Sequence, residues 1–256
     1  MRMERQASEE AVSIGQRITE AISIRTVFTI RLFGNEIPIS DTVIGSWVAM
    51  AIIVAAAIAV TRRLRDVPRR PQAIAEAFVE FADSFACGVM GPAGKAYAPF
   101  LGTLAAYLAV ANLLPMLTPI GGFGFEPPFE IKPIMRDINI TAGLSASVIA
   151  VVLGSSIAKR GVLGWAASLL KPVAFMLPFN ILEYAIRPVS LALRLFGNIL
   201  GAFIIMRLIE ALVPIGAPPI AGLYFDLFDG VMQTVVFVYL STIFIGEAIH
   251  MEEAHE

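Results

Sequence analysis

The sequence predicts an all-α, polytopic membrane protein with about five crossings, a surface amphipathic helix and two long tilted membrane helices at its C-terminal end. Hydrophobic residues make up 57% of the 256 residues and charged residues only 16%, which is more apolar surface than one soluble core needs. Several runs approach the roughly 20 apolar residues that cross a bilayer core of about 30 Å. Clusters of arginine and lysine beside these runs indicate their direction.

The charge balance and the single cysteine exclude several classes of function. A net charge of −2 provides no basic excess for nucleic acid, so no nucleic-acid partner is expected. Cys87 alone cannot form an intrachain disulfide or a thiolate metal cluster. We therefore expect no metal site, and no motif in the sequence indicates a cofactor.

Residues 1–42 are predicted to form an N-terminal segment outside the membrane. The opening stretch has charges of both signs and no apolar core, so we expect no cleaved signal peptide. The first span, at about 43–60, is followed by five arginines: Arg62, Arg63, Arg65, Arg69 and Arg70. Because positively charged loops stay in the cytoplasm, the N-terminus is predicted to lie outside. Residues 43–256 are predicted to form a single membrane domain.

The middle of the chain is predicted to contain a surface helix and two further spans. Over residues 71–90, apolar and acidic side chains lie on opposite faces of a helix: Ile74, Phe78, Phe81 and Phe85 against Glu76, Glu80 and Asp83. The spans are expected at about 97–117 and 138–158, joined by a loop rich in glycine and proline. Lys159 and Arg160 then return the chain to the inside.

Two apolar stretches at the C-terminal end, at about 179–212 and 220–250, are longer than an upright span and are predicted to be strongly tilted. The tail after them is predicted to be cytoplasmic. Each stretch carries a polar stripe at helical spacing. The stripes are Asn180, Glu183, Arg187, Ser190, Arg194 and Asn198 on the first, and Asp226, Asp229, Gln233, Glu247 and His250 on the second.

Arg194 is the most informative member of these stripes. A charge at the bilayer centre costs from roughly 3 to more than 10 kcal/mol, so it persists where it faces protein or water and has a task. A guanidinium cannot escape this cost by losing its proton. Glu183 lies three turns away along the helix, too far for a local pair. Another chain is therefore a candidate source of the negative partner.

The stretch "PFNILEYAIRPVSLALRLFGNILGAF" resembles the signature of subunit a of the membrane sector of F-type ATP synthases, in its bacterial and chloroplast branch. Three further segments are similar to that family. They are "PFLGTLAAYLAVANLLPML", "MRDINITAGLSASVIAVVLG" with Asp137, Asn139 and Thr141, and the final span from "FDLFDGVMQTVV" to the Gly-Glu and histidine ending. The resemblance covers roughly residues 43–256.

The resemblance implies a stator subunit without a catalytic site of its own. It implies that Arg194 faces the carboxylate of each passing c subunit, and that Asn198 and Gln233 lie on the same ion route. Two aqueous half-channels would carry protons to and from the rotating c-ring. The implied partners are the c-ring, the peripheral stalk b subunits, the rest of the ATP synthase complex and the lipid bilayer. We expect a bacterial plasma membrane as the location, because the N-terminal segment shows no recognisable plastid transit sequence.

The sequence departs from this family at one position. Many members have a glutamate nine residues after the arginine, in the outer half-channel, where this chain has Phe203. We expect Asp226 and Asp229 to take its place, because they lie on the Gln233 stripe near its outer end. Glu247 and His250, at the inner end, are candidates for the exit route or for side chains at the membrane interface.

Plainer interpretations remain open beside these. Asn198 and Gln233 are also suited to hydrogen bonding between helices. Asp226 and Asp229 are also suited to a wet loop or the start of a helix. A stand-alone secondary ion or solute transporter is the alternative function, although repeated halves are not found. Arg207 and Glu210 are spaced as a local ion pair. A second "RLFGN", at 31–35, precedes the first span and is interpreted as coincidence.

Overall fold

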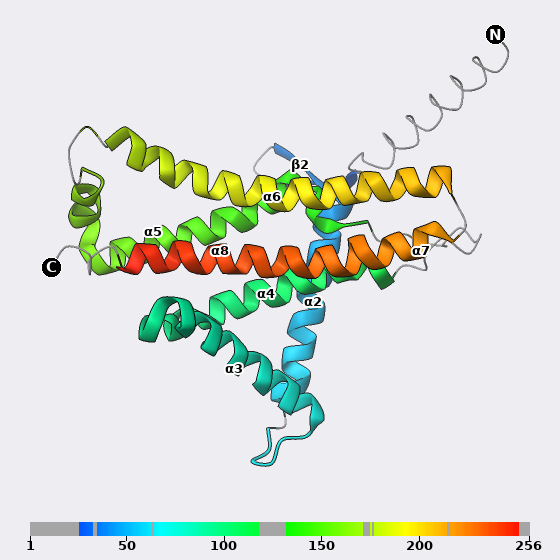
Figure 1. Ribbon diagram of the computed structural model, residues 1–256, viewed down its shortest axis with the longest axis horizontal. Helices are drawn as coiled ribbons and strands as arrows, with labels where there is room; N and C mark the ends of the chain where they lie inside the picture. The colour runs from blue at the N-terminus through cyan, green and yellow to red at the C-terminus, as the bar shows by residue number, and fades with distance from the viewer. Residues whose placement is uncertain are drawn as a thin grey trace, which may run out of the picture.

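The computed structural model describes residues 26–32, 35–62, 64–117, 132–170, 175, 177–213 and 216–250 (Figure 1). The first 25 residues, most of the loop before Pro133 and the tail after His250 lie outside this part of the chain. Expectations for those segments therefore stay predictions.

The described chain begins with a β-hairpin that the sequence analysis did not predict. Strand β1 (Thr26–Leu32) pairs antiparallel with β2 (Asn35–Ser40), and Leu32 lies opposite Asn35. The first copy of RLFGN thus spans the end of one strand and the start of the next. Arg31 forms an ion pair with Glu36 at 2.7 Å between exposed side chains. This copy is not part of a membrane helix, in agreement with the prediction.

The first membrane helix, α2 (Asp41–Thr61), begins where Ser40 accepts a hydrogen bond from the backbone N–H of Val43 at its first turn. Few of its residues are buried against the rest of the chain. Helix α3 (Arg70–Met90) starts with a proline in its first turn and corresponds to the predicted surface helix. A 3₁₀ turn, η1 (Gly91–Ala96), then leads to α4 (Ala98–Leu113).

The second half of the chain begins with short 3₁₀ turns and a long helix. Segment η2 (Leu114–Leu117) extends α4, and η4 (Ile134–Arg136) precedes α5 (Ile138–Ser168). Helix α5 continues past the predicted end of its span at 158. It does so across a kink at Gly161, whose φ of 71° favours glycine.

The two predicted long stretches correspond to α6 (Leu177–Leu212) and to a composite of three segments. These are α7 (Ala217–Gly222), the π-helical turn η6 (Leu223–Asp229) and α8 (Gly230–His250). Figure 1 shows α5, α6 and α8 as long rods running in similar directions, with α2 crossing them. These four helices therefore cannot all stand upright in one membrane. This agrees with the tilt predicted for the two long stretches at the C-terminal end. Within the described residues, four helices are long and apolar enough to span a membrane, and α4 is a shorter apolar helix.

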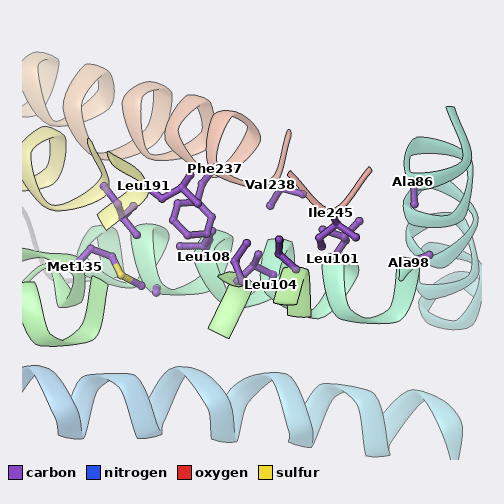
Figure 2. Packing of buried hydrophobic residues seen from close by; sticks show 14 of the residues in the cluster. Ala86, Ala98, Leu101, Leu104, Leu108, Met135, Leu191, Phe237, Val238 and Ile245 are labelled. Carbon is purple, nitrogen blue, oxygen red and sulfur yellow. The ribbon is translucent and has the colours of Figure 1, made fainter. Parts of the chain in front are cut away.

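The hydrophobic core holds α8 against α4. Figure 2 shows Leu101, Leu104 and Leu108 of α4 beside Phe237 and Ile245 of α8. On α6 the buried side chains recur every three or four residues: Leu191, Leu195, Ile199 and Phe203. Because this face of α6 is packed, chiefly against α5, the opposite face with Arg194 is left uncovered by the chain itself.

Candidate functional site: the Arg194 face of α6

Arg194 differs from the other two arginines of α6. Arg187 and Arg207 each form an ion pair with a carboxylate. Arg194 is exposed and, among the residues that the structure describes, has no hydrogen-bonded or ionic partner. A fixed charge on a membrane helix needs a partner, so this side chain is placed to meet one from outside the chain.

The surface around Arg194 is open. Ser190, Leu193, Gly197 and Asn198 share its exposed face of α6. A Cβ built on Gly197 would meet no atom within 4 Å. Small residues allow a second helix to approach closely. This exposed face therefore has room for a second helix beside the charge of Arg194.

One turn beyond Arg194, a hydrogen-bonded group joins α6 to the start of α8. The amide Nδ2 of Asn198 donates to Asp229 Oδ1 at 3.0 Å and to Gln233 Oε1 at 3.2 Å. Gln233 is only 4% exposed, and its own Nε2 has no partner within the described part of the chain. Buried polar groups are normally satisfied, so this amide is suited to a water molecule or to another polar group. The structure thus brings together three of the predicted site residues.

Of the two aspartates expected at the outer end of the route, the structure describes the side chain of one. Asp226 and Asp229 both lie in η6, a π-helical turn, and such turns are frequent at functional sites. Asp229 is half-buried and contacts Asn198. The side chain of Asp226 lies outside the described part. The predicted contact of Asp226 with the route therefore stays a prediction.

Asn112 of α4 belongs to the same neighbourhood and was missed by the sequence analysis. Its Nδ2 donates to the carbonyl oxygen of Gly230 and to Thr234 Oγ1, both at 3.2 Å. Asn112 is buried, and a Cβ added to Gly230 would lie 3.2 Å from the Cβ of Asn112. The signal that could have identified it is a lone amide inside the apolar run "LAVANLL". Asn112 fixes the first turn of α8, and with it the position of Gln233.

At the other end of α8, Glu247 does not stand alone. Its Oε2 forms an ion pair with Arg187 Nη2 at 2.7 Å, and the same nitrogen of Arg187 contacts Glu183. Glu183 and Arg187 are four residues apart, a spacing that suits a local ion pair, and the structure contains this pair. The link to Glu247 was not foreseen. The side chain of His250 lies outside the described residues, so its part in an exit route is not tested.

Phe203 occupies an unusual position on α6. Its ring is buried beneath two guanidinium groups, those of Arg136 at 5.7 Å and Arg207 at 5.1 Å from its centroid. Arg207 is paired with Glu210 at 2.9 Å, as predicted. Two cations beside an aromatic face are attracted to its electron-rich ring. At this position an aromatic ring, and not a carboxylate, contacts the two guanidinium groups.

Arg136 joins the N-terminal ends of α2 and α5. Its side chain is 0% exposed and pairs with Asp41 at 2.8 Å. Burial lowers the pKa of the Arg136 guanidinium, and the neighbouring Asp41 and Asp137 carboxylates oppose that shift. Asp137 also accepts a bond from Thr42 Oγ1 at 2.7 Å and caps α5 through the N–H of Asn139 at 2.9 Å. The Asp-Asn-Thr motif thus builds a helix start that is tied to α2.

Comparison with known proteins gives a consistent result. Residues 43–246 match the family model described as ATP synthase A chain. The chain is 32% identical over 225 residues to ATP synthase subunit a, sodium ion specific, of Propionigenium modestum, covering 84% of this chain and 78% of that one. It is 31% identical over 217 residues to ATP synthase subunit a of Moorella thermoacetica, covering 84% and 94%.

Proposed function

The chain belongs to the ATP synthase A chain family, and we propose that its Arg194 is the charge past which the c-ring turns. The chain is a polytopic membrane protein, the membrane-sector stator subunit of an F-type ATP synthase, with the ion-channel role of that family. Membership of this family decides against the alternative function, a stand-alone transporter. The proposal concerns the residues that carry the ions and the partners they meet.

One observation carries the proposal. Within the described chain, Arg194 is the arginine of α6 without a carboxylate beside it, and it lies on an exposed face. A c-subunit carboxylate that passes this face would be held ionised by the guanidinium, because an opposite charge nearby favours the charged form. The same carboxylate must bind a proton before it enters lipid, since a bare charge there is costly. Ion flow and rotation are thereby coupled.

The outer half-channel is assigned to the Asn198, Gln233 and Asp229 group, with Asp226 one turn earlier. Asp229 supplies a carboxylate where Phe203 cannot. Glu247 and His250 are assigned to the exit at the far end of α8. In this arrangement the N-terminus faces outward and the C-terminus lies in the cytoplasm of a bacterium. A potential of 100 mV contributes about 2.3 kcal/mol for each charge moved between the two sides.

The experiment compares the arginines of the two RLFGN copies. Vesicles with the complete synthase are prepared with Arg194→Ala or with Arg31→Ala, the hairpin copy of RLFGN. We expect Arg194→Ala to abolish ATP-driven proton pumping while passive proton leak through the membrane sector persists or rises. Arg31→Ala should pump as the wild type does, because its partner Glu36 lies in the same exposed hairpin. Pumping that survives Arg194→Ala would show that the arginine is structural.

The coupling ion is tested in the same vesicles. One relative is named sodium ion specific, whereas the hydrogen-bonded Asn198 group of this chain is suited to proton transfer. We propose proton coupling, so pumping should be equal with and without added Na⁺. A requirement for Na⁺ would change the ion assigned to the route and leave the test of Arg194 unaffected.

A further inference from the structure

Three charged side chains from two helices meet near the C-terminal end of α8. Arg187 lies on α6 and Glu247 on α8, with 2.7 Å between Arg187 Nη2 and Glu247 Oε2. Glu183, one turn before Arg187, contacts the same nitrogen. The guanidinium also lies over the ring of Phe244, 5.0 Å from its centroid. Arg187 is 12% exposed, while both carboxylates are about half exposed.

Among the described residues, this cluster is one of two polar contacts between α6 and the final helical stretch that flank Arg194. The other is Asn198 with Asp229 and Gln233. Arg194 lies seven residues after Arg187 and four before Asn198, or about 10 Å and 6 Å along a helix. A polar link on each side restricts both sliding and rotation of α6 against α8.

We propose that Arg187 is a positioning residue that ties the end of α8 to α6 and orients the Glu247 carboxylate for proton release. The inference rests on the proposed function, because it assigns Glu247 to the exit. One guanidinium with two carboxylates gives these three side chains a net charge of −1, and Lys159 of α5 lies nearby, with its Nζ 3.5 Å from the carbonyl oxygen of Ile249. Glu247 Oε1 has no partner among the described residues, so this oxygen is available to a proton while Oε2 is held.

The pairing also explains how a second arginine is tolerated on the same polar stripe. With its charge opposed by Glu183 and Glu247, Arg187 does not compete with Arg194 for the c-subunit carboxylate. Hydrogen bonds between charged groups are stronger than neutral ones, and Phe244 limits how far the guanidinium can move. Arg187 therefore acts through Glu247 and does not itself contact the transported ion.

The test is a double-variant cycle in vesicles that contain the complete synthase, with pumping expressed per assembled complex. The variants are Arg187→Gln, Glu247→Gln, their combination and Arg187→Lys. Arg207→Gln is the matched control, because Arg207 is also a paired arginine of α6 but its partner Glu210 lies on the same helix. Arg194→Ala is included as the separate test of the proposed function.

We expect Arg187→Gln and Glu247→Gln to lower pumping to a similar extent, roughly fivefold, with the combination no worse than either. Arg187→Lys should retain more activity than Arg187→Gln, because an ammonium keeps the charge and one bond. Arg207→Gln should pump like the wild type. A purely structural residue would lower the amount of assembled complex and leave the pumping per complex unchanged.

Three results would overturn the inference. They are normal pumping of Arg187→Gln while Arg194→Ala is inactive, additive losses in the double variant, and no difference between the lysine and glutamine variants. If Arg187→Gln does not assemble, the comparison of Arg187→Lys with Glu247→Gln decides the matter: losses that add in their combination contradict a shared role. Pumping by Arg194→Ala would contradict the proposed function instead.

Discussion

The buried pair of Arg136 with Asp41 makes an asymmetric prediction about stability. The guanidinium side chain is 0% exposed, whereas the carboxylate side chain is 28% exposed. Asp41→Ala therefore leaves a buried cation with less compensation. Arg136→Met leaves Asp41, which water can reach, and the buried Asp137, which keeps its hydrogen bonds from Thr42 and Asn139. Losing one partner of a buried pair costs about 3–5 kcal/mol, and Asp137 still attracts the guanidinium. We therefore expect a loss of about 2–3 kcal/mol in the free energy of unfolding for Asp41→Ala.

Arg136→Met should cost less than about 1 kcal/mol, because methionine keeps apolar packing on Phe203 and removes the buried charge. The assay is thermal unfolding of the purified subunit in detergent, followed by near-ultraviolet circular dichroism. The expected fall in Tm for Asp41→Ala is roughly 4–12 °C for a chain of this size. Asp66→Ala, in the exposed connection between α2 and α3, is the control and should leave Tm unchanged. If Arg136→Met is as damaging as Asp41→Ala, the explanation from desolvation is wrong.

Two further predictions concern the start of α8. Asp226→Asn combined with Asp229→Asn should lower ATP-driven proton pumping while assembly is retained, because both removable protons of the proposed outer route are lost; unchanged pumping would contradict the assignment. Gly230→Val should destabilise the subunit by about 1–3 kcal/mol, because even a Cβ would approach Asn112 to 3.2 Å. Thermal unfolding measures this loss, with Gly143→Val in α5, whose Cβ would meet nothing within 4 Å, as the control. Equal Tm values for the two glycine variants would contradict the close contact.

The membrane helices could be predicted because their signal is local. Length and apolar composition identify α2, α5, α6 and α8. The direction expected from the arginines beside the spans stays a prediction. The β-hairpin was missed because its two strands have only seven and six residues. A search for apolar runs of about 20 residues does not detect segments of this length. The kink at Gly161 allowed α5 to continue past the charged pair Lys159 and Arg160, which a span-length criterion treats as an end.

The candidate site was predictable only along each helix. Helical spacing places Asn180, Glu183, Arg187, Arg194 and Asn198 in one stripe, and the ion pair of Glu183 with Arg187 follows from a separation of four residues. Spacing carries no information about which residue of a distant helix lies opposite. The contacts of Asn198 with Gln233 and of Arg187 with Glu247 depend on how α6 packs on α8, and so they required the structure.

The two copies of RLFGN show why a short motif needs its surroundings. In the hairpin, Arg31 has Glu36 beside it and water around both side chains, so the pair contributes little. In α6, the apolar residues on both sides of Arg194 continue a helix, and the carboxylates of Glu183 and Asp229 contact Arg187 and Asn198 instead. The same five residues thus produce a satisfied surface charge in one place and an unsatisfied charge in the other. A charge in a membrane persists where it faces water or a partner, and under the proposed function that partner is the carboxylate of each passing c subunit.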